Sequence, residues 1–190
     1  LTITVASSNT TLISNLDVDY TNPAATAVLS YTANQHQFGS AIITVTVNDG
    51  NVTNNLISRQ VKVTVLPVPD LPTVSNASTN QGVQSTTGLV IDRNENDGGE
   101  VSYFKITNIR NGTLFLSDGV SQISNNEFIT YAQGKAGLRF SPSSNVNGSF
   151  DVQASLTNAN SGLGPDIATA IIFINSIPTT TNLPDLTLNE

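Results

Sequence analysis

The densest group of polar side chains in this 190-residue sequence lies at residues 92–100, which read Asp-Arg-Asn-Glu-Asn-Asp-Gly-Gly-Glu. Oxygen-bearing side chains alternate at Asp92, Asn94 and Asn96, and they are followed by Asp97 and Gly98. Calcium takes about six to eight oxygen ligands, and a short loop of Asp, Asn and Gly can supply several of them. The pattern therefore resembles half of a calcium loop, and Asp92, Asn94, Asn96 and Asp97 are the candidate ligands.

A solvated acidic turn between two strands is the competing interpretation of the same residues. Asp, Asn and Gly are favoured in exposed turns whether or not an ion binds there. The full EF-hand pattern also fails, because its twelfth position holds Tyr103 rather than Glu. The sequence leaves both interpretations open, and calcium is the one cofactor that we consider.

Residues suited to catalysis are sparse. His36 is the single histidine, the chain has no cysteine, and the fourteen acidic residues are dispersed without a motif that nominates a pair. No glycine-rich phosphate loop follows a strand. Asn48-Asp-Gly50 is interpreted as a tight hairpin turn rather than a ligand site, because Asn-Gly and Asp-Gly accept positive φ. We therefore predict that the chain is not an enzyme.

Composition narrows the possible partners. The net charge is −7, from seven basic and fourteen acidic residues. An acidic chain without a basic cluster is a poor nucleic-acid binder, since phosphate contacts supply most of that affinity. No apolar run approaches the roughly 20 residues of a membrane helix, so membrane insertion is not expected. Without cysteine, disulfides and thiolate metal sites are excluded.

The elements that must position these side chains are strands. Apolar residues occupy every second position in residues 1–5, 43–47 and 61–65. This alternation gives a strand one apolar and one polar face. Further candidate strands are 101–107, 113–116, 128–131, 138–140, 149–156 and 168–174, with Asn-Gly and Asp-Gly turn signals between several of them. We predict an all-β fold of antiparallel β-sandwiches.

An internal repeat predicts more than one such module. At an offset of 109 residues, Leu29-Ser-Tyr31 aligns with Leu138-Arg-Phe140, and Gly39-Ser40 with Gly148-Ser149. Farther along, Pro69-Asp-Leu71 recurs as Pro184-Asp-Leu186. A period of roughly 110 residues is the size of one sandwich domain. We therefore predict tandem sandwiches arranged end to end: residues 1–67 as the C-terminal part of one repeat, 68–177 as a complete repeat, and 178–190 as a linker and first strand of the next.

The predicted first module lacks its opening strands. Such a module would have a groove lined by unpaired backbone groups and apolar side chains. Leaving these groups unpaired is costly, so another strand should fill the groove. The segment Leu183–Glu190 is a short alternating strand with Leu186 and Leu188 on one face. We predict that this segment of a neighbouring subunit adds to the groove as a donated strand. The alternative is completion by strands of the same polypeptide, in a longer array from which this sequence is a window.

Several motifs resemble a known family. They are Gln37-Phe-Gly39, Ile43-Thr-Val-Thr-Val-Asn-Asp-Gly50 and Val68-Pro-Asp-Leu-Pro-Thr73. They resemble the cadherin-like and immunoglobulin-like tandem repeats of large bacterial surface adhesins, whose linkers usually carry Asn where this chain has Pro69. The motifs Asn111-Gly-Thr-Leu-Phe-Leu116 and Phe140-Ser-Pro142 resemble a sister pattern. Cadherin-like repeats often bind calcium between a loop and a linker, which by analogy adds Asp70 and Glu100 to the candidate ligands.

The resemblance implies an adhesive, structural role on the bacterial cell surface. Its expected partners are neighbouring repeats or identical subunits, in a stalk or filament. The alternative is a carbohydrate-binding or accessory module of a secreted polysaccharide-active enzyme, with surface glycans as partners. Such modules usually present Trp or Tyr platforms, whereas this chain has no Trp and only four Tyr.

Overall fold

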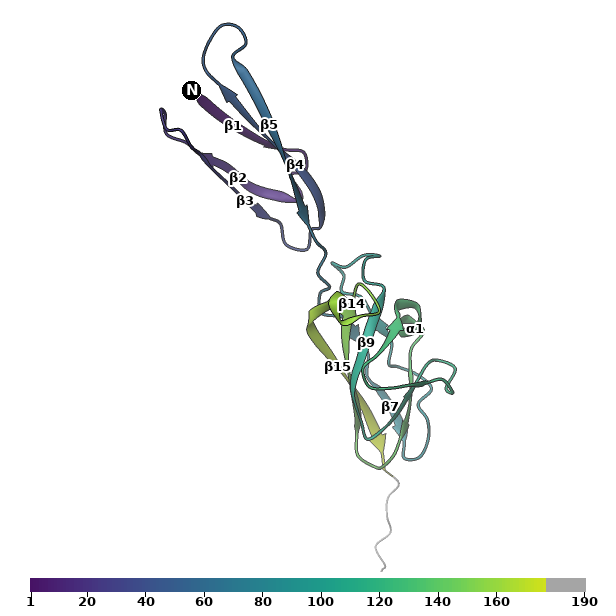
Figure 1. The fold of residues 1–190 in the computed structure, drawn as a ribbon. Helices are drawn as coiled ribbons and strands as arrows, with labels where there is room; N and C mark the ends of the chain where they lie inside the picture. Colours follow the sequence, from purple (N-terminus) through teal and green to yellow (C-terminus); the bar gives the residue numbers. More distant parts are fainter. Residues whose placement is uncertain (177–190) are drawn as a thin grey trace, which may run out of the picture. The chain divides into compact units, whose positions relative to one another are not determined.

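The computed structural model describes residues 1–176, and the fold is all-β (Figure 1). Strands make up 51% and helices 5% of the structure. The chain divides into two compact units, residues 1–68 and residues 69–190. The division falls inside the proline-rich segment 66–72. The two units are called the first and the second unit below, and each is described by itself.

The first unit contains a three-stranded antiparallel sheet and a separate hairpin. The sheet has the order β1-β4-β5, and Ile43 of its central strand pairs with Val61. The hairpin pairs β2 with β3. The bounds of these strands are β1 Thr2–Ser7, β2 Ile13–Asp19, β3 Val28–Ala33, β4 Gly39–Asn48 and β5 Leu56–Val65.

The core of the first unit is small. Leu12, Ile13 and Ala41 are buried together, with Val63 and Val65 packed against them. The alternating residues 43–47 and 61–65 are buried unequally. Ile43 is fully buried, whereas Val61 keeps 48% of its surface exposed. The reason is that no other strand among the described residues pairs with the outer edge of β5.

Residues 69–176 of the second unit form three sheets. A five-stranded sheet has the order β12-β9-β14-β15-β7, a three-stranded sheet the order β11-β10-β13, and β6 pairs with β8. All pairs are antiparallel except β7 with β15. The strand bounds are β6 Thr73–Val74, β7 Ala77–Asn80, β8 Ile91–Asp92, β9 Tyr103–Arg110, β10 Gly112–Phe115, β11 Gln122–Ile123, β12 Glu127–Thr130, β13 Arg139–Pro142, β14 Gly148–Ser155 and β15 Leu163–Asn175.

The core of the second unit is extensive. Alternation on the paired strands sends every second side chain inward, so Phe104, Phe150 and Val152 are fully buried. The Phe140 ring lies directly against two glycines. A Cβ atom would be 2.4 Å from the ring at Gly112 and 2.3 Å from it at Gly148, which is too close for any other residue. The glycines therefore make room for the largest side chain of β13.

The two units share one strand arrangement. The sheet β1-β4-β5 corresponds to β9-β14-β15, and the pairing of β2 with β3 corresponds to that of β10 with β13. The register also corresponds, since Gly39 pairs with Val65 in one unit and Gly148 with Ile172 in the other. The opening strands β6, β7 and β8 of the second unit have no counterpart among residues 1–68.

Two local predictions need correction. A tight turn was expected at Asn48-Asp-Gly50, but Asn48 pairs with Leu56, so the loop spans residues 49–55. Position 131 was expected to end a strand, but it opens the short helix α1, Tyr131–Lys135. The Thr130 side chain caps this helix and Gln133 completes a capping box, which interrupts the extended backbone. A single 3₁₀ turn, η1, covers Asn160–Gly162.

Candidate functional site

The predicted acidic loop follows β8 and borders a hollow in the second unit. This hollow has a volume of about 600 Å³. It is lined by Asp92, Asn94, Asn96 and Asp97 of the loop and by Thr73 and Tyr131, together with Arg93 and Glu95. The loop is thus an accessible part of the surface, and its carboxylates are the candidate functional groups.

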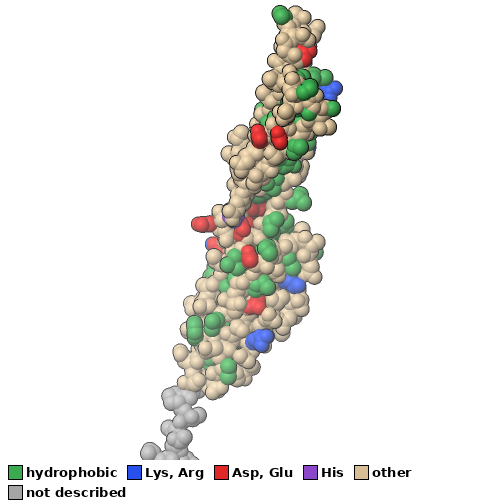
Figure 2. Space-filling model, turned by 90° about the vertical axis from the view of Figure 1, so that its left-hand side faces the viewer, with side chains coloured by type: hydrophobic (Ala, Val, Ile, Leu, Met, Phe, Trp, Pro, Cys, Tyr) green, Lys and Arg blue, Asp and Glu red, His purple; other side chains and the backbone are tan. Residues whose placement is uncertain are grey.

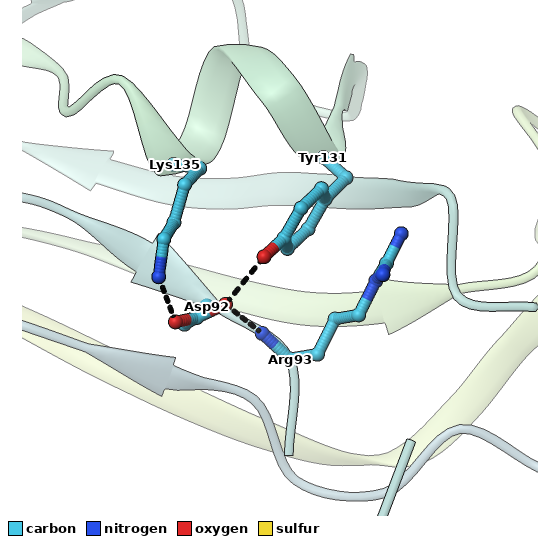
Figure 3. Close-up of polar contacts among 4 residues, drawn as sticks. All are labelled: Asp92, Arg93, Tyr131 and Lys135. Atoms are coloured by element: carbon cyan, nitrogen blue, oxygen red, sulfur yellow. Dashed lines mark hydrogen bonds and ion pairs between the residues drawn. The ribbon is translucent and has the colours of Figure 1, made fainter. Parts of the chain in front are cut away.

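Asp92 is held by three donors (Figure 3). One carboxylate oxygen accepts hydrogen bonds from the Tyr131 hydroxyl at 2.9 Å and from the Arg93 backbone N–H at 3.0 Å. The other oxygen forms an ion pair with the Lys135 ammonium group. Helix α1 supplies both Tyr131 and Lys135, because residues four apart lie on one helix face. The Arg93 guanidinium lies 3.7 Å from the centre of the Tyr131 ring, within the range of a cation–π contact.

These contacts shift the pKa values of both members of the ion pair. The hydrogen bond from Lys135 is the main cause that lowers the pKa of the Asp92 carboxyl, opposed by partial burial and reinforced by Tyr131. The same bond raises the pKa of the Lys135 ammonium group. Asp92 is therefore engaged as a structural anion between β8 and α1, and its oxygens face protein donors.

Asp97 occupies a different environment. Both of its carboxylate oxygens accept from the Asp70 backbone N–H, at 3.2 Å each. Burial raises the pKa of Asp97, and the nearby carboxylates of Asp70 and Glu100 raise it further, while the hydrogen bond from Asp70 opposes the shift. The structure thus brings together three of the six predicted ligands, Asp70, Asp97 and Glu100.

Asn94, Asn96 and Glu100 already form hydrogen bonds with protein groups. Asn94 Oδ1 accepts from the backbone and side-chain nitrogens of Asn96, each at 3.1 Å. Asn94 Nδ2 donates to the Leu71 carbonyl at 3.0 Å. Glu100 Oε1 accepts from the Gly98 N–H at 2.6 Å. The side chains of the loop thus bond to its own backbone and amides and, through Asn94, to the segment that enters the second unit.

The predicted calcium ligands remain a prediction. Within residues 1–176, no group of three or more carboxylate, histidine or cysteine side chains is arranged to hold a metal ion. Asp92 faces Lys135, and Glu100 faces the backbone of its own turn. Calcium binding here stays a prediction, and it would require Asp70, Asp97 and Glu100 to rearrange.

Three further residues are His36 and Tyr31 of the first unit and Tyr131 of the second. His36 has a left-handed backbone, φ 57°, in the connection between β3 and β4. Tyr31 is 45% exposed, although its repeat partner Phe140 is fully buried. Tyr131 packs against Arg93 and Phe104. The donor candidates Leu186 and Leu188 lie outside the described residues.

Lys135, Tyr131 and Arg93 were missed as site residues. For Tyr131 and Lys135, the sequence contained one signal. The Thr-x-x-Gln pattern at Thr130 and Gln133 is a capping box, which indicates the start of the helix that holds both residues. Nothing in the sequence links that helix to Asp92, 43 residues away from Lys135. Figure 2 shows the acidic side chains scattered over a mostly uncharged polar surface, without one large charged patch on the face drawn.

Comparisons with known proteins do not assign a family. No protein-family model matches the chain, and no curated protein matches its sequence. None of the helices in residues 1–176 has the length and apolar character needed to cross a bilayer.

Proposed function

We propose that this chain is part of the structural, adhesive repeat region of an extracellular bacterial surface protein. Its modules would be antiparallel β-sandwiches of immunoglobulin-like or cadherin-like type in tandem, in a stalk or filament. The observation that carries the proposal is the shared strand arrangement of the two units, β1-β4-β5 in one and β9-β14-β15 in the other. Repetition of one fold along a chain adds length without adding a new site, which suits a stalk.

The second unit has a geometry that resists pulling. Its chain enters through the two-residue β6 and then β7, and the described part ends with β15; β7 and β15 lie side by side in parallel. Tension applied to the two ends therefore pulls β7 and β15 in opposite directions along their shared ladder. All the hydrogen bonds between them are loaded together in shear, rather than opened one by one. A module loaded in this way transmits force, as a stalk between a cell and a surface must.

Force spectroscopy on the full 190-residue chain, tethered at its two ends, tests the mechanical part of the proposal. We expect unfolding of the second unit to be the high-force event. Asn76→Ala should lower that force, because Asn76 Oδ1 accepts from the Ile171 N–H at 2.8 Å beside the ladder. The matched control is Asn125→Ala, which removes a bond to the Ile109 N–H away from β7 and β15. Equal effects of the two variants would contradict the idea that β7 and β15 carry the tension.

Labelling of intact cells tests the location. An antibody against the second unit should stain unpermeabilised cells of the organism that carries the gene, and protease treatment of those cells should remove the signal. Staining only after permeabilisation would overturn the proposal. A glycan array probed with the chain distinguishes the carbohydrate-binding alternative, which requires a saturable signal.

A further inference from the structure

A smaller hollow of the second unit has no lining residue in common with the hollow beside the acidic loop. Its volume is about 300 Å³, at the lower end of the roughly 300–1,000 Å³ of small-ligand pockets. It lies between the segment that precedes β8, the turn after β10 and the residues that follow helix α1. Arg139 is the one charged residue that lines it, so we call it the Arg139 hollow.

Two contacts hold the Arg139 side chain in place. Its Nε donates to the Ser117 carbonyl at 2.7 Å, which ties β13 to the turn after β10. Its Cδ lies 3.1 Å from the position that a Cβ on Gly119 would take, so the same turn also packs against the stem. A guanidinium group that is already positioned loses less conformational entropy when a ligand binds.

The two terminal nitrogens of Arg139 are available to a ligand. Among residues 1–176, the bond from Nε is the one hydrogen bond that this side chain donates. No buried side-chain nitrogen or oxygen in that part of the chain lacks a partner, so the unbonded terminal nitrogens are accessible to solvent. The half-buried Arg139 therefore presents a fork of N–H donors at the surface.

The neighbouring carboxylate of Asp118 does not occupy this fork. It accepts from the Ser121 hydroxyl at 2.6 Å and from the backbone N–H groups of Val120 and Ser121 at 2.9 Å each. The bond from the Ser121 hydroxyl is the main cause that lowers the pKa of Asp118, and the charge of Arg139 is the smallest cause. Asp118 thus completes its own turn rather than pairing with Arg139.

We infer that the Arg139 hollow binds the carboxylate of an acidic sugar, such as a uronic acid unit of a polysaccharide. A guanidinium fork matches the planar carboxylate with two parallel hydrogen bonds. One Arg also balances the single charge of a carboxylate, whereas a phosphate carries up to two charges and calls for more donors.

The rest of the lining suits a hydroxylated ring. Thr86, Thr87 and Ser117 line the hollow and are exposed, and each hydroxyl can both donate and accept. Val90, which is 39% exposed, adds an apolar surface for the C–H groups of a sugar ring. Because this recognition uses a charged fork and hydroxyls, it does not require the Trp platform that the chain lacks.

The charge of the whole chain makes the inference selective. A net charge of −7 repels anions at long range, so binding of an acidic sugar has to come from a local site. The inference adds a ligand to the proposed structural role and does not rest on that role.

A nuclear magnetic resonance titration of the full ¹⁵N-labelled chain tests the site. Sodium galacturonate is added up to millimolar concentrations, at about 0.15 M salt. We expect saturable shifts of the Arg139 Nε–H signal and of the backbone N–H signals of Thr86, Thr87 and Gly137. The matched ligands are galactose, which lacks the carboxylate, and sodium acetate, which lacks the ring. Both should bind at least about tenfold more weakly, since one charged hydrogen bond or several neutral ones are lost.

Arg139→Gln should weaken galacturonate binding by roughly tenfold or more. The matched control is Arg110→Gln, an exposed arginine of β9 in the same unit, which should leave the affinity unchanged. If Arg139→Gln fails to fold because the bond to Ser117 is lost, Thr87→Val decides instead. This variant keeps the shape of an exposed side chain, removes one hydroxyl of the hollow and should weaken binding severalfold.

The outcomes separate this inference from the proposed function. Saturable binding that Arg139→Gln or Thr87→Val weakens and Arg110→Gln does not supports the site. Equal affinity for acetate and galacturonate, shifts at other residues, or no shift overturns it. If intact cells stain while galacturonate does not bind, the inference alone is wrong. If galacturonate binds at the hollow while intact cells do not stain, the proposed location is wrong and the site stands.

Discussion

The backbone N–H of Asp70 donates to both carboxylate oxygens of Asp97, at 3.2 Å each, across 27 residues of sequence. This contact joins the entry of the second unit to the acidic loop. It also brings the carboxylates of Asp70 and Glu100 close enough to raise the pKa of Asp97, for which burial is the larger cause. The loop therefore contains negative charge that the fold does not fully compensate.

Asp97→Asn should stabilise the protein at pH 7. The substitution removes a partly buried charge and keeps an amide oxygen that can accept from the Asp70 N–H. A carboxyl whose pKa is raised in the folded state destabilises that state when ionised, so the advantage of the variant should disappear as the pH falls to the ordinary Asp pKa of 3.8. Thermal melts from neutral pH down to that value check this. A lower Tm than the wild type at pH 7 would show that the charged hydrogen bond outweighs burial.

Calcium should raise the Tm of the wild-type chain if Asp70, Asp97 and Glu100 rearrange around an ion. Binding to the folded state alone stabilises it by mass action. Melts at millimolar calcium measure the shift, and Asp97→Asn should abolish it. Asp166→Asn, at an exposed position on β15 of the same unit, is the matched control and should retain the shift. An unchanged Tm of the wild type at millimolar calcium would count against the predicted site.

Tyr131→Phe should lower the free energy of unfolding by about 0.5–1.5 kcal/mol, the usual contribution of one hydrogen bond. The loss arises because the Tyr131 hydroxyl donates to Asp92 at 2.9 Å, while the ring can keep its contacts with Arg93 and Phe104. Urea unfolding at pH 7 measures the change. Tyr103→Phe is the matched control, and an equal loss in both variants would argue against a specific role for the Asp92 contact.

The Asp92–Lys135 ion pair should make a pH-dependent contribution to the stability of the folded protein. The pKa of Asp92 is lowered from 3.8 and that of Lys135 is raised from 10.5. The stabilisation is therefore present between these values, lost below pH 3.8 as Asp92 is protonated, and lost above pH 10.5 as Lys135 loses its proton. Lys135→Met should lower Tm slightly at pH 7 and should not lower it at a pH well below 3.8, where Asp92 is protonated. Because both side chains are well exposed, a large drop at pH 7 would contradict a surface ion pair.

Gly148→Ala should destabilise the second unit by about 1–3 kcal/mol through overpacking. The added methyl group would lie 2.3 Å from the Phe140 ring in a fully buried part of the core. Gly99→Ala is the control, because no atom lies within 4 Å of the Cβ position there. Chemical denaturation of both variants measures the change in the free energy of unfolding. Equal changes would mean that the Phe140 ring can move aside without destabilising the core.

The sequence by itself determined the class of fold and the positions of most strands. Alternation at residues 43–47 and 61–65 depends only on neighbouring residues, and β4 and β5 contain both runs. The repeat at an offset of 109 also anticipated that Gly39 and Gly148 hold equivalent positions in paired strands. These properties are local or statistical, so no knowledge of long-range contacts is needed to find them.

Only the tertiary structure decided which distant groups meet. The parallel pairing of β7 with β15 joins Ala77 to Ile172, and the ion pair joins Asp92 to Lys135. Such contacts depend on how whole strands and a helix pack around Phe104 and Phe140, which no window of sequence encodes. For the same reason, Asp92 belongs with Lys135 and Tyr131, whereas Asp97 faces Asp70 and Glu100. Spacing and the family resemblance together had placed all these carboxylates in one ligand set, but side-chain direction and the location of the donors separate them.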